Sequence, residues 1–444
     1  MVLQRVLSLV FVAVAIGCVH VSHIENQRLS RYEAGAGYGS KLAPDPFDGE
    51  LRVVLAFSGG GTRAAALAYG VLKEIRATEV VIGGQKRPLL EAVTTISSVS
   101  GGSFTSAYYG LYGDRIFEDF EERFLRQDIQ GRLIRTLLRP LEFLRLQFTP
   151  YTRSDLAADI YDEKVFDGAT FADLAQAGGP ILNINATDLD VGTVFTFIQP
   201  EFNLICSDLS KMRVSHAVTA SSAVPGAFAP LHLKNFAGTC ELPEPAWIEE
   251  ALANPRASRR RHHEAVYAES YLDAKKRPNV FLVDGGVADN IGAHRLIADV
   301  VETGGYWKLA KENKVTVPST VLYIVVNAQP GKKHTWVEKG PSLTDVLGAL
   351  SSVGMHRYNF ETIELLRYVT AQWSKEASQR GHRVEPYVTE VAFSNLSDRA
   401  EREFFNGVAT SFDLDDETVD RLIEVGGRLL RESQDFQDFL ARQK

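Results

Sequence analysis

The sequence has few of the features that mark metal, redox or nucleic-acid sites. Its 444 residues include three cysteines, and neither a zinc-type Cys or His spacing nor an H-E-x-x-H pattern occurs. The Lys-Ser or Lys-Thr pair that completes a phosphate-binding loop is missing after the glycine-rich run. The net charge is −8, whereas nucleic-acid binding needs a basic surface. We therefore expect no metal, no cofactor and no nucleic-acid partner.

What the chain does have begins with a short apolar segment. Residues 6–16 are apolar and follow the basic Arg5, but the run is shorter than the ~20 residues that cross a bilayer. Residues 1–17 are therefore predicted to be a signal peptide. The ending Ala-Ile-Gly-Cys resembles a bacterial lipobox, which would lipidate Cys18; an ordinary cleaved signal or a core helix is the alternative. Because Val19 is not the Asp associated with inner-membrane retention, we expect a lipid-anchored protein of the bacterial cell envelope, at the outer membrane.

Two cysteines remain once Cys18 is set aside. Disulfides persist in the envelope compartment. A bridge between Cys206 and Cys240 would close a loop of roughly 34 residues and stabilise the fold by ~3–4 kcal/mol. Two free buried thiols are the alternative.

Apolar runs alternate with helical patterns through most of the chain, whose composition of 45% hydrophobic and 23% charged residues is ordinary for a globular protein. The runs read LRVVLAF, EAVTTISSV, PILNINATDL, NVFLVDGG and TVLYIVVNA. Continuous apolar strands separated by helices predict an α/β fold, with a mainly parallel central sheet covered by helices on both faces.

The same pattern predicts the domain organisation. Residues 18–49 are polar and contain Gly and Pro, so we expect a lipid-anchored tether and lead-in. Residues 50–444 form the domain. Within it, 241–278 is charged and rich in Pro and Ala, which predicts a mobile insertion whose SRRRHHE run is a solvated loop; a lid or a headgroup contact is the alternative. Two long helical patterns follow, 342–380 and 415–443.

Three motifs follow predicted strands, and in open α/β sheets ligands bind at the carboxyl ends of strands. The first motif is SGGGTR. Its Gly59, Gly60 and Gly61 come between a strand and a helix, where backbone N–H groups and the positive helix end attract an anion. We interpret the loop as an oxyanion hole. A tight turn is one alternative; another is a dinucleotide-binding G-x-G-x-x-A loop ending at Ala64, with the basic pair 86–87 near a 2′-phosphate.

The second motif, SSVSGGS, places Ser100 between a predicted strand and a predicted helix. A nucleophile on such a strained elbow needs small neighbours, which are Ser98, Gly101 and Gly102 here. Ser98 stands where the G-x-S-x-G elbow has glycine. Alone, the motif would indicate no more than a polar turn.

The third motif, VDGG, delivers Asp284 from a buried strand onto an open turn. Burial would raise the pKa of this carboxyl and make it a better base for a serine hydroxyl, whereas the alternative role is to cap a turn. A triad would need an imidazole from His294, His334, His356 or His382, and none of these follows an apolar strand. We therefore favour a Ser–Asp dyad.

In this order, SGGGTR, SVSGGS and VDGG resemble the motifs of the patatin-like phospholipases, bacterial lipoprotein-type members in particular. The resemblance covers roughly residues 50–300 and includes INATDLDVGTVFTF and VTASSAVPGAFAP. It implies a three-layer α/β/α fold and hydrolysis of lipid acyl esters without metal or cofactor. It also implies a Ser100 nucleophile, an Asp284 base, and an Arg63 that steadies the glycine loop or meets a phosphate.

These expectations combine into a lipid acyl hydrolase of phospholipase A or lysophospholipase type, acting through an acyl-enzyme on membrane lipids or other acyl esters at a membrane surface. The alternatives are a non-catalytic lipoprotein that binds lipid or protein, and a dinucleotide-binding oxidoreductase. Residues 131–148 carry arginines on one helical stripe and leucines on the other side, with Pro140 breaking the pattern. We expect a helix packed on the core with a solvated face; a helix on an anionic membrane is the alternative.

Overall fold

The computed structural model describes residues 21–443, except for 24, 43–45, 332–339 and 341–342. The predicted signal peptide and the lipidated Cys18 lie outside the described residues, as does His334. Within the described part of the chain, no helix is both long enough and apolar enough to cross a bilayer.

Nine strands of the described residues form one mixed sheet in the order β1-β10-β11-β7-β6-β3-β12-β13, with β8 also paired to β7. The five neighbours β7, β6, β3, β12 and β13 are parallel, as the apolar runs predicted. By contrast, β11 is antiparallel to β7, and β10 is antiparallel to β11. The bounds are β1 (Ser22–His23), β3 (Leu51–Phe57), β6 (Val93–Val99), β7 (Ile181–Asp188), β8 (Thr193–Thr196), β10 (Leu231–Lys234), β11 (Asn279–Asp284), β12 (Thr320–Asn327) and β13 (Glu385–Ala392).

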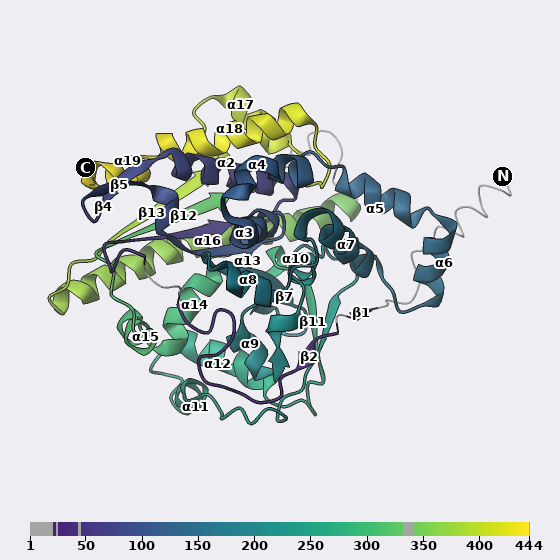
Figure 1. The fold of residues 1–444 in the computed structure, drawn as a ribbon, viewed down its shortest axis with the longest axis horizontal. Helices are drawn as coiled ribbons and strands as arrows, with labels where there is room; N and C mark the ends of the chain where they lie inside the picture. The colour runs from purple at the N-terminus through teal and green to yellow at the C-terminus, as the bar shows by residue number, and fades with distance from the viewer. Residues whose placement is uncertain (1–20, 24, 43–45, 332–339, 341–342, 444) are drawn as a thin grey trace.

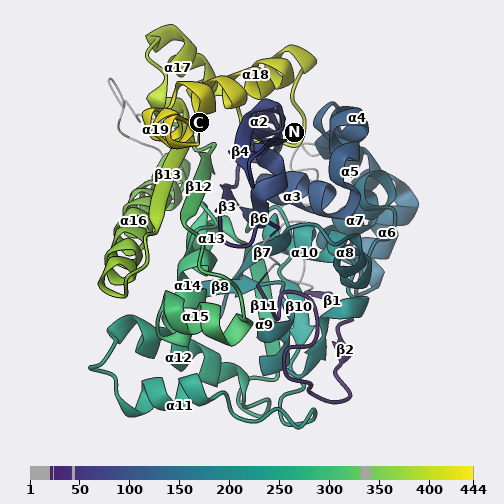
Figure 2. The ribbon, with the colours of Figure 1, turned by 60° about the vertical axis from the view of Figure 1, so that its left-hand side comes forward.

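Helices cover both faces of this sheet (Figure 2). Side chains of β3 alternate between two cores: Leu55 and Phe57 pack with α2 (Thr62–Ala77) and α18 (Asp416–Glu432), whereas Val54 and Ala56 face the core that includes α14 (His294–Thr303) and α16 (Leu343–Gln379). The predicted three-layer α/β/α fold is therefore confirmed. Further helices are α3 (Gly101–Tyr112), α4 (Ile116–Phe120), α5 (Ile129–Leu137), α6 (Pro140–Phe148), α7 (Arg153–Tyr161), α8 (Phe171–Ala177), α9 (Gln199–Leu204), α10 (Val214–Ser221), α13 (Gly286–Asp289), α15 (Tyr306–Asn313) and α17 (Arg399–Gly407).

Two expectations about helices need correction. The SRRRHHE run is not a loop, because Ser258 Oγ accepts the Arg261 N–H at 3.3 Å and caps α12 (Arg259–Tyr271), which follows α11 (Ala246–Ala253) in the insertion. Whether the insertion is mobile stays a prediction. The second C-terminal pattern is two helices, α18 and α19 (Gln434–Arg442), because the chain at Ser433 is extended.

Cys206 and Cys240 are joined by a disulfide, with their Cα atoms 5.5 Å apart. The segment before β3 forms hydrogen bonds with both cysteines. The Leu29 N–H donates to the Cys206 carbonyl at 2.8 Å, and the Tyr32 N–H donates to the Cys240 carbonyl at 2.7 Å. The bridge therefore also fixes the path of the chain before β3.

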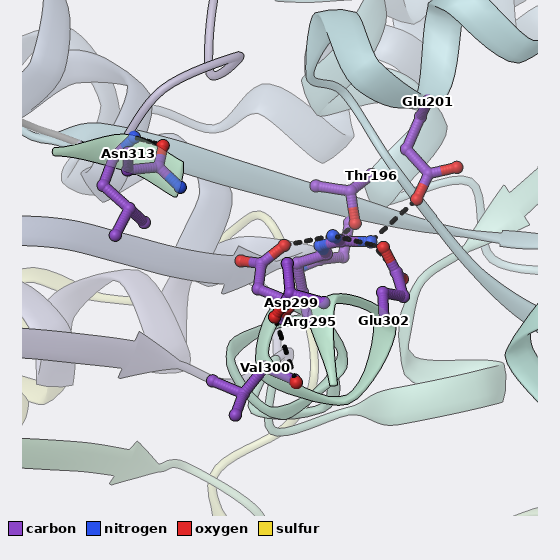
Figure 3. Close-up of polar contacts among 10 residues, drawn as sticks. Thr196, Glu201, Arg295, Asp299, Val300, Glu302 and Asn313 are labelled. Atoms are coloured by element: carbon purple, nitrogen blue, oxygen red, sulfur yellow. Dashed lines mark hydrogen bonds and ion pairs between the residues drawn. The ribbon is translucent and has the colours of Figure 1, made fainter. Parts of the chain in front are cut away.

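A buried ion cluster joins α14 to α9 (Figure 3). Arg295 lies between Glu201 of α9, at 2.8 Å, and Glu302, at 3.1 Å, and also contacts Asp299. The guanidinium is almost completely buried. Glu201 therefore connects α9 to α14, while Asp299 and Glu302 neutralise the same guanidinium from within α14.

Candidate active site

The register of the sheet brings Ser100 and Asp284 to either side of β7. Val99 at the end of β6 pairs with Asn185, and Asp284 at the end of β11 pairs with Ala186. Each of the three motifs follows a strand, as expected, but β11 is antiparallel to β7, whereas β3 and β6 are parallel to their neighbours. The short strand β11 approaches from the opposite direction and stops at the level of Ser100.

Ser100 occupies a strained turn between β6 and α3. Its φ of 49° and ψ of −121° lie in a region that L-residues rarely adopt, and the residue is 5% exposed. A Cβ on Gly101 would lie 2.0 Å from the Gly61 carbonyl oxygen, so only glycine fits beside Ser100. The Ser100 N–H donates to Ser221 Oγ at 2.9 Å and thereby holds the turn.

The serine that replaces the first elbow glycine is accommodated by a hydrogen bond. Ser98 is fully buried, and its Oγ lies 2.6 Å from Ser106 Oγ on α3. On the other side of the elbow, a Cβ on Gly102 would lie 2.8 Å from Phe57 Cβ, so α3 packs directly on β3. The change from glycine to Ser98 therefore leaves the elbow intact, because Ser106 on the facing helix forms a hydrogen bond with the added hydroxyl.

The glycine loop differs from our expectation at one residue. The Gly59 N–H donates to the Asn290 carbonyl at 3.0 Å and is not available to an oxyanion. Among the described residues, the N–H groups of Gly60 and Gly61 have no hydrogen-bond partner. A Cβ on Gly59 would lie 3.2 Å from Ser100 Cβ, so the loop borders the serine. The loop thus offers two free amides of the kind an oxyanion hole requires.

Arg63 connects this loop to two segments of the chain that are distant in sequence. It is buried and donates three hydrogen bonds: Nε to the Ala328 carbonyl at 2.9 Å, Nη1 to the Val408 carbonyl at 2.7 Å, and Nη2 to Thr410 Oγ1 at 3.0 Å. Burial lowers the pKa of its guanidinium to about 10. Of the two roles that the resemblance implied, these contacts match the one in which Arg63 steadies the glycine loop.

Asp284 is a buried carboxylate, and no cation lies beside it in the described part of the chain. Its backbone is fixed, because its N–H donates to the Ala223 carbonyl at 2.9 Å and its carbonyl accepts from Thr187 Oγ1 at 2.8 Å. The carboxylate Oδ1 accepts the Gly286 N–H at 2.8 Å. Burial raises the pKa of Asp284 to about 6, and hydrogen bonds from Gly286 and the Ser100 hydroxyl oppose this rise.

The described histidines of the triad alternative have other surroundings. His294 Nε2 lies 3.4 Å from Glu264, which together with the charge of Asp289 raises the pKa of the imidazole against the opposing effect of burial. The ring of His382 lies 4.9 Å from that of Trp307, and His356 lies half-buried on α16. The contacts described above for Ser100 and Asp284 involve no imidazole.

The alternative of a dinucleotide-binding loop finds little support in the structure. The Thr62 N–H at the start of α2 donates to the Ser411 carbonyl at 2.9 Å, so this helix end is not free for a pyrophosphate. The basic pair 86–87 lies on the hairpin of β4 (Glu79–Ile82) and β5 (Gln85–Pro88) and forms ion pairs with Glu79 and Glu91. No group of three potential metal ligands occurs among the described residues.

Two supporting residues were missed by the sequence analysis. Besides accepting from the Ser100 amide, Ser221 Oγ donates to the Asn185 carbonyl at 2.6 Å. The Asn185 side chain donates to the Ser98 carbonyl at 3.1 Å and accepts from Thr196 Oγ1 at 2.8 Å. Both lie in the quoted segments INATDLDVGTVFTF and VTASSAVPGAFAP, so the segments were recognised but these contacts were not.

Asn290 is a third residue that the motifs did not indicate. It is 6% exposed. A Cβ on Gly59 would lie 2.5 Å from its Oδ1, and a Cβ on Gly286 would lie 2.9 Å from the same atom. Its amide therefore borders both the glycine loop and the turn after Asp284, where a substrate or water could use it.

Comparison with known proteins gives the class. The family model described as patatin-like phospholipase matches residues 55–297, more than half of the chain. The chain therefore belongs to the patatin-like phospholipase family, whose members are lipid acyl hydrolases in general. No curated protein matches it.

Two solved structures are similar in fold. Human GIVD cytosolic phospholipase A2 shares 13% identity at a TM-score of 0.47, over 88% of this chain and 62% of that one. VipD from Legionella pneumophila shares 10% identity at a TM-score of 0.34, over 95% of this chain and 71% of that one. This chain thus spans less than two thirds of the human protein.

Proposed function

We propose that the protein hydrolyses acyl esters of membrane phospholipids or lysophospholipids with a Ser100–Asp284 dyad. The observation that carries this proposal is the buried Asp284, which interacts with the hydroxyl of a serine on a strained elbow. Its pKa of about 6 keeps the carboxylate charged at neutral pH and also makes it a stronger base than an ordinary aspartate.

The proposed reaction has two stages. Ser100 Oγ attacks the acyl carbonyl carbon while its proton passes to Asp284, and the Gly60 and Gly61 amides stabilise the oxyanion. The ester C–O bond breaks, and Asp284 returns the proton to the leaving alkoxide. Water then attacks the acyl-enzyme and gives a proton to Asp284. The fatty acid leaves, and that proton returns to Ser100.

Ser100→Ala tests the proposal on vesicles of phosphatidylethanolamine and phosphatidylglycerol. The unsubstituted protein is expected to release fatty acid, and Ser100→Ala to release at least about 1,000-fold less. Ser210→Ala, a serine outside the site, serves as the matched control and retains activity. Equal inactivity of all three proteins on vesicles, lysolipids and short-chain esters would favour the alternative of a lipoprotein that binds lipid or protein without catalysis.

We also propose that the protein is anchored to the bacterial cell envelope, at the outer membrane, through a lipid on Cys18. The support is the lipobox-like ending at Cys18 and the substrate class of the family. Mass spectrometry of the mature protein tests it. We expect an acylated Cys18 at the N-terminus and release of the protein into the soluble fraction when Cys18→Ser is introduced; an unmodified N-terminus would contradict the anchor.

A further inference from the structure

Residues 129–148 form an arm of two short helices, α5 and α6, separated by the break that Pro140 was expected to cause. We expected this segment to pack on the core, and that is wrong for α6, in which no residue is buried. Leu141 and Phe148 are each 80% exposed, and Leu138 between the two helices is 77% exposed. In Figure 1, α6 lies at the edge of the molecule, away from the sheet.

Apolar side chains lie on several sides of α6. Leu141, Leu144 and Phe148 are spaced three and four residues apart and form one stripe, and Phe143, 42% exposed, lies on the opposite side. A contiguous exposed apolar surface of this kind marks an interaction site in a soluble domain.

The charge of the arm is opposite to that of the whole chain. Residues 129–148 contain four arginines and one glutamate, a net charge of +3 in a chain of net charge −8. Arg135 pairs with Asp128 at 2.8 Å and Arg145 with Glu142 at 3.6 Å, and Arg132 interacts electrostatically with Asp128 and Glu163. Exposed apolar side chains next to a net positive charge match the surface of an anionic bilayer, where acyl chains lie beneath phosphate groups.

Both ends of the arm are attached to the active site. At its start, the Ile129 N–H donates to the Phe412 carbonyl, and the neighbouring Ser411 carbonyl accepts the Thr62 N–H at the end of the glycine loop. These bonds connect α5 to the loop that borders the nucleophile.

Past its end, Ser154 Oγ of α7 donates to the Ala229 carbonyl at 2.6 Å. The loop that contains Ala229 begins at Ala223, whose carbonyl accepts the Asp284 N–H. Val224 in this loop is 42% exposed. A loop next to the proposed base thus also exposes an apolar side chain.

The start of the described chain lies on the same side. Ser22 of β1 donates from Oγ to Asp155 of α7 at 2.5 Å. Cys18 precedes Ser22 by four residues, which reach at most about 14 Å. The described chain thus begins beside α7, the helix that follows the arm.

We propose that residues 129–148 dock the protein onto an anionic phospholipid bilayer, with Leu141, Leu144 and Phe148 among the acyl chains and the arginines at the phosphates. This inference rests on the proposed function, because docking at this position would present the Ser100 site to the lipid from which acyl chains are released.

Tryptophan fluorescence locates the arm independently of catalysis. In the full chain carrying Ser100→Ala, Phe148→Trp is compared with Tyr368→Trp, at a residue that is also exposed but lies on α16. With phosphatidylglycerol vesicles that contain brominated lipid, we expect quenching of the tryptophan at 148 and none at 368, after subtraction of the signal from the four native tryptophans. Equal quenching at both positions, or none at 148, would overturn the docking surface.

A triple substitution tests its consequence. The variant carries Leu141→Gln, Leu144→Gln and Phe148→Gln together. We expect its rate of phospholipid hydrolysis in vesicles to fall on the order of 100-fold, because three apolar side chains no longer enter the lipid. Hydrolysis of a soluble short-chain ester should stay unchanged. The matched control, Val81→Gln, Val266→Gln, Tyr368→Gln, keeps both activities.

The remaining outcomes distinguish the proposals. Loss of the short-chain activity together with the vesicle activity would overturn docking in favour of damage to the site. If the unsubstituted protein is a dimer and the triple variant a monomer by light scattering, with vesicle binding unchanged, a second copy covers the arm and the membrane proposal is wrong. If no protein hydrolyses any ester but the tryptophan at 148 is quenched, the proposed function fails and the docking surface stands.

Discussion

Two buried aspartates flank the same part of the sheet, and their partners differ. Asp284 pairs in the sheet with Ala186, and Asp188, two residues along β7, pairs with Leu282. Asp188 is completely buried, accepts from the Tyr271 hydroxyl at 2.6 Å and contacts the Arg277 guanidinium. Asp284 has instead one backbone amide and the hydroxyl of a serine.

Burial raises the pKa of both carboxyls above the ordinary value. A raised pKa alone therefore does not identify a base, since structural ion pairs show it as well. What separates the two is the partner: an arginine fixes Asp188 in an ion pair, whereas Asp284 faces a hydroxyl whose proton it can accept. The comparison predicts that one carboxylate serves chemistry and the other serves stability.

Asp284→Asn should give the largest effect on catalysis. Without a base for Ser100, we expect kcat to fall by about 1,000-fold, measured by fatty-acid release from lysolipid micelles. The free energy of unfolding should not fall, because asparagine can still accept the Gly286 N–H. A variant that retains more than a tenth of the activity would contradict the role of Asp284 as base.

Asp188→Asn should reverse this pattern. Removing the carboxylate leaves the buried Arg277 without its counter-charge, which costs about 3–5 kcal/mol of stability. Chemical denaturation should show this loss, while kcat per folded molecule stays within a few-fold of the unsubstituted enzyme. A loss of activity with unchanged stability would mean that Asp188, rather than its neighbour alone, takes part in the reaction.

The stability of the protein should depend on pH through the protonation of Asp284. Because its folded-state pKa, about 6, is above the unfolded value of 3.8, the folded protein binds the proton more tightly between these values. Its contribution to stability is therefore present below pH 4 and is lost as the pH rises through 6, by up to about 3 kcal/mol. Asp284→Asn should remove this loss, so the variant is expected to be more stable at pH 8.

Catalysis should show the opposite dependence on pH. The base acts only when deprotonated, so kcat/KM is expected to fall about tenfold for each pH unit below 6. The profile is recorded with a short-chain ester, for which binding to vesicles plays no part. Activity that stays constant down to pH 4 would contradict a base with this pKa.

Ser221→Ala should have a smaller effect. It removes the acceptor of the Ser100 N–H and the donor to the Asn185 carbonyl, so the strained elbow relaxes. We expect kcat to fall about tenfold with KM nearly unchanged. Ser222→Ala, at the residue that follows α10 and whose Oγ donates to the Val218 carbonyl, is the matched control and should keep its kcat.

His294→Gln should have the smallest effect on turnover. Its imidazole pairs with Glu264 and not with Ser100 or Asp284, so kcat should stay within about threefold. A loss as large as that of Ser100→Ala would favour a triad over the dyad.

The proposed reacting groups stand out in the sequence because each follows an apolar run and lies next to glycines. SGGGTR, SVSGGS and VDGG are local signals, and the turns they form are local as well. The supporting contacts could not be predicted in this way. Ser221 lies 121 residues from Ser100, and the partner of the Gly59 amide is the carbonyl of Asn290. Only the tertiary fold brings such groups together.

The antiparallel direction of β11 was missed for a related reason. An apolar run such as NVFLVD is buried in either direction, so its composition carries no information about pairing. The arm shows a second limit: the spacing identified the leucine and arginine sides of residues 131–148, but it did not predict that no residue of α6 is buried.

The most direct test of the Ser100–Asp284 dyad is covalent labelling with an alkyl fluorophosphonate, followed by peptide mass spectrometry. We predict a single adduct on the peptide that contains Ser100, formed about 100-fold or more slowly in Asp284→Asn and at the unsubstituted rate in His294→Gln. No adduct, an adduct on another serine, or a rate that Asp284→Asn leaves unchanged would contradict the dyad.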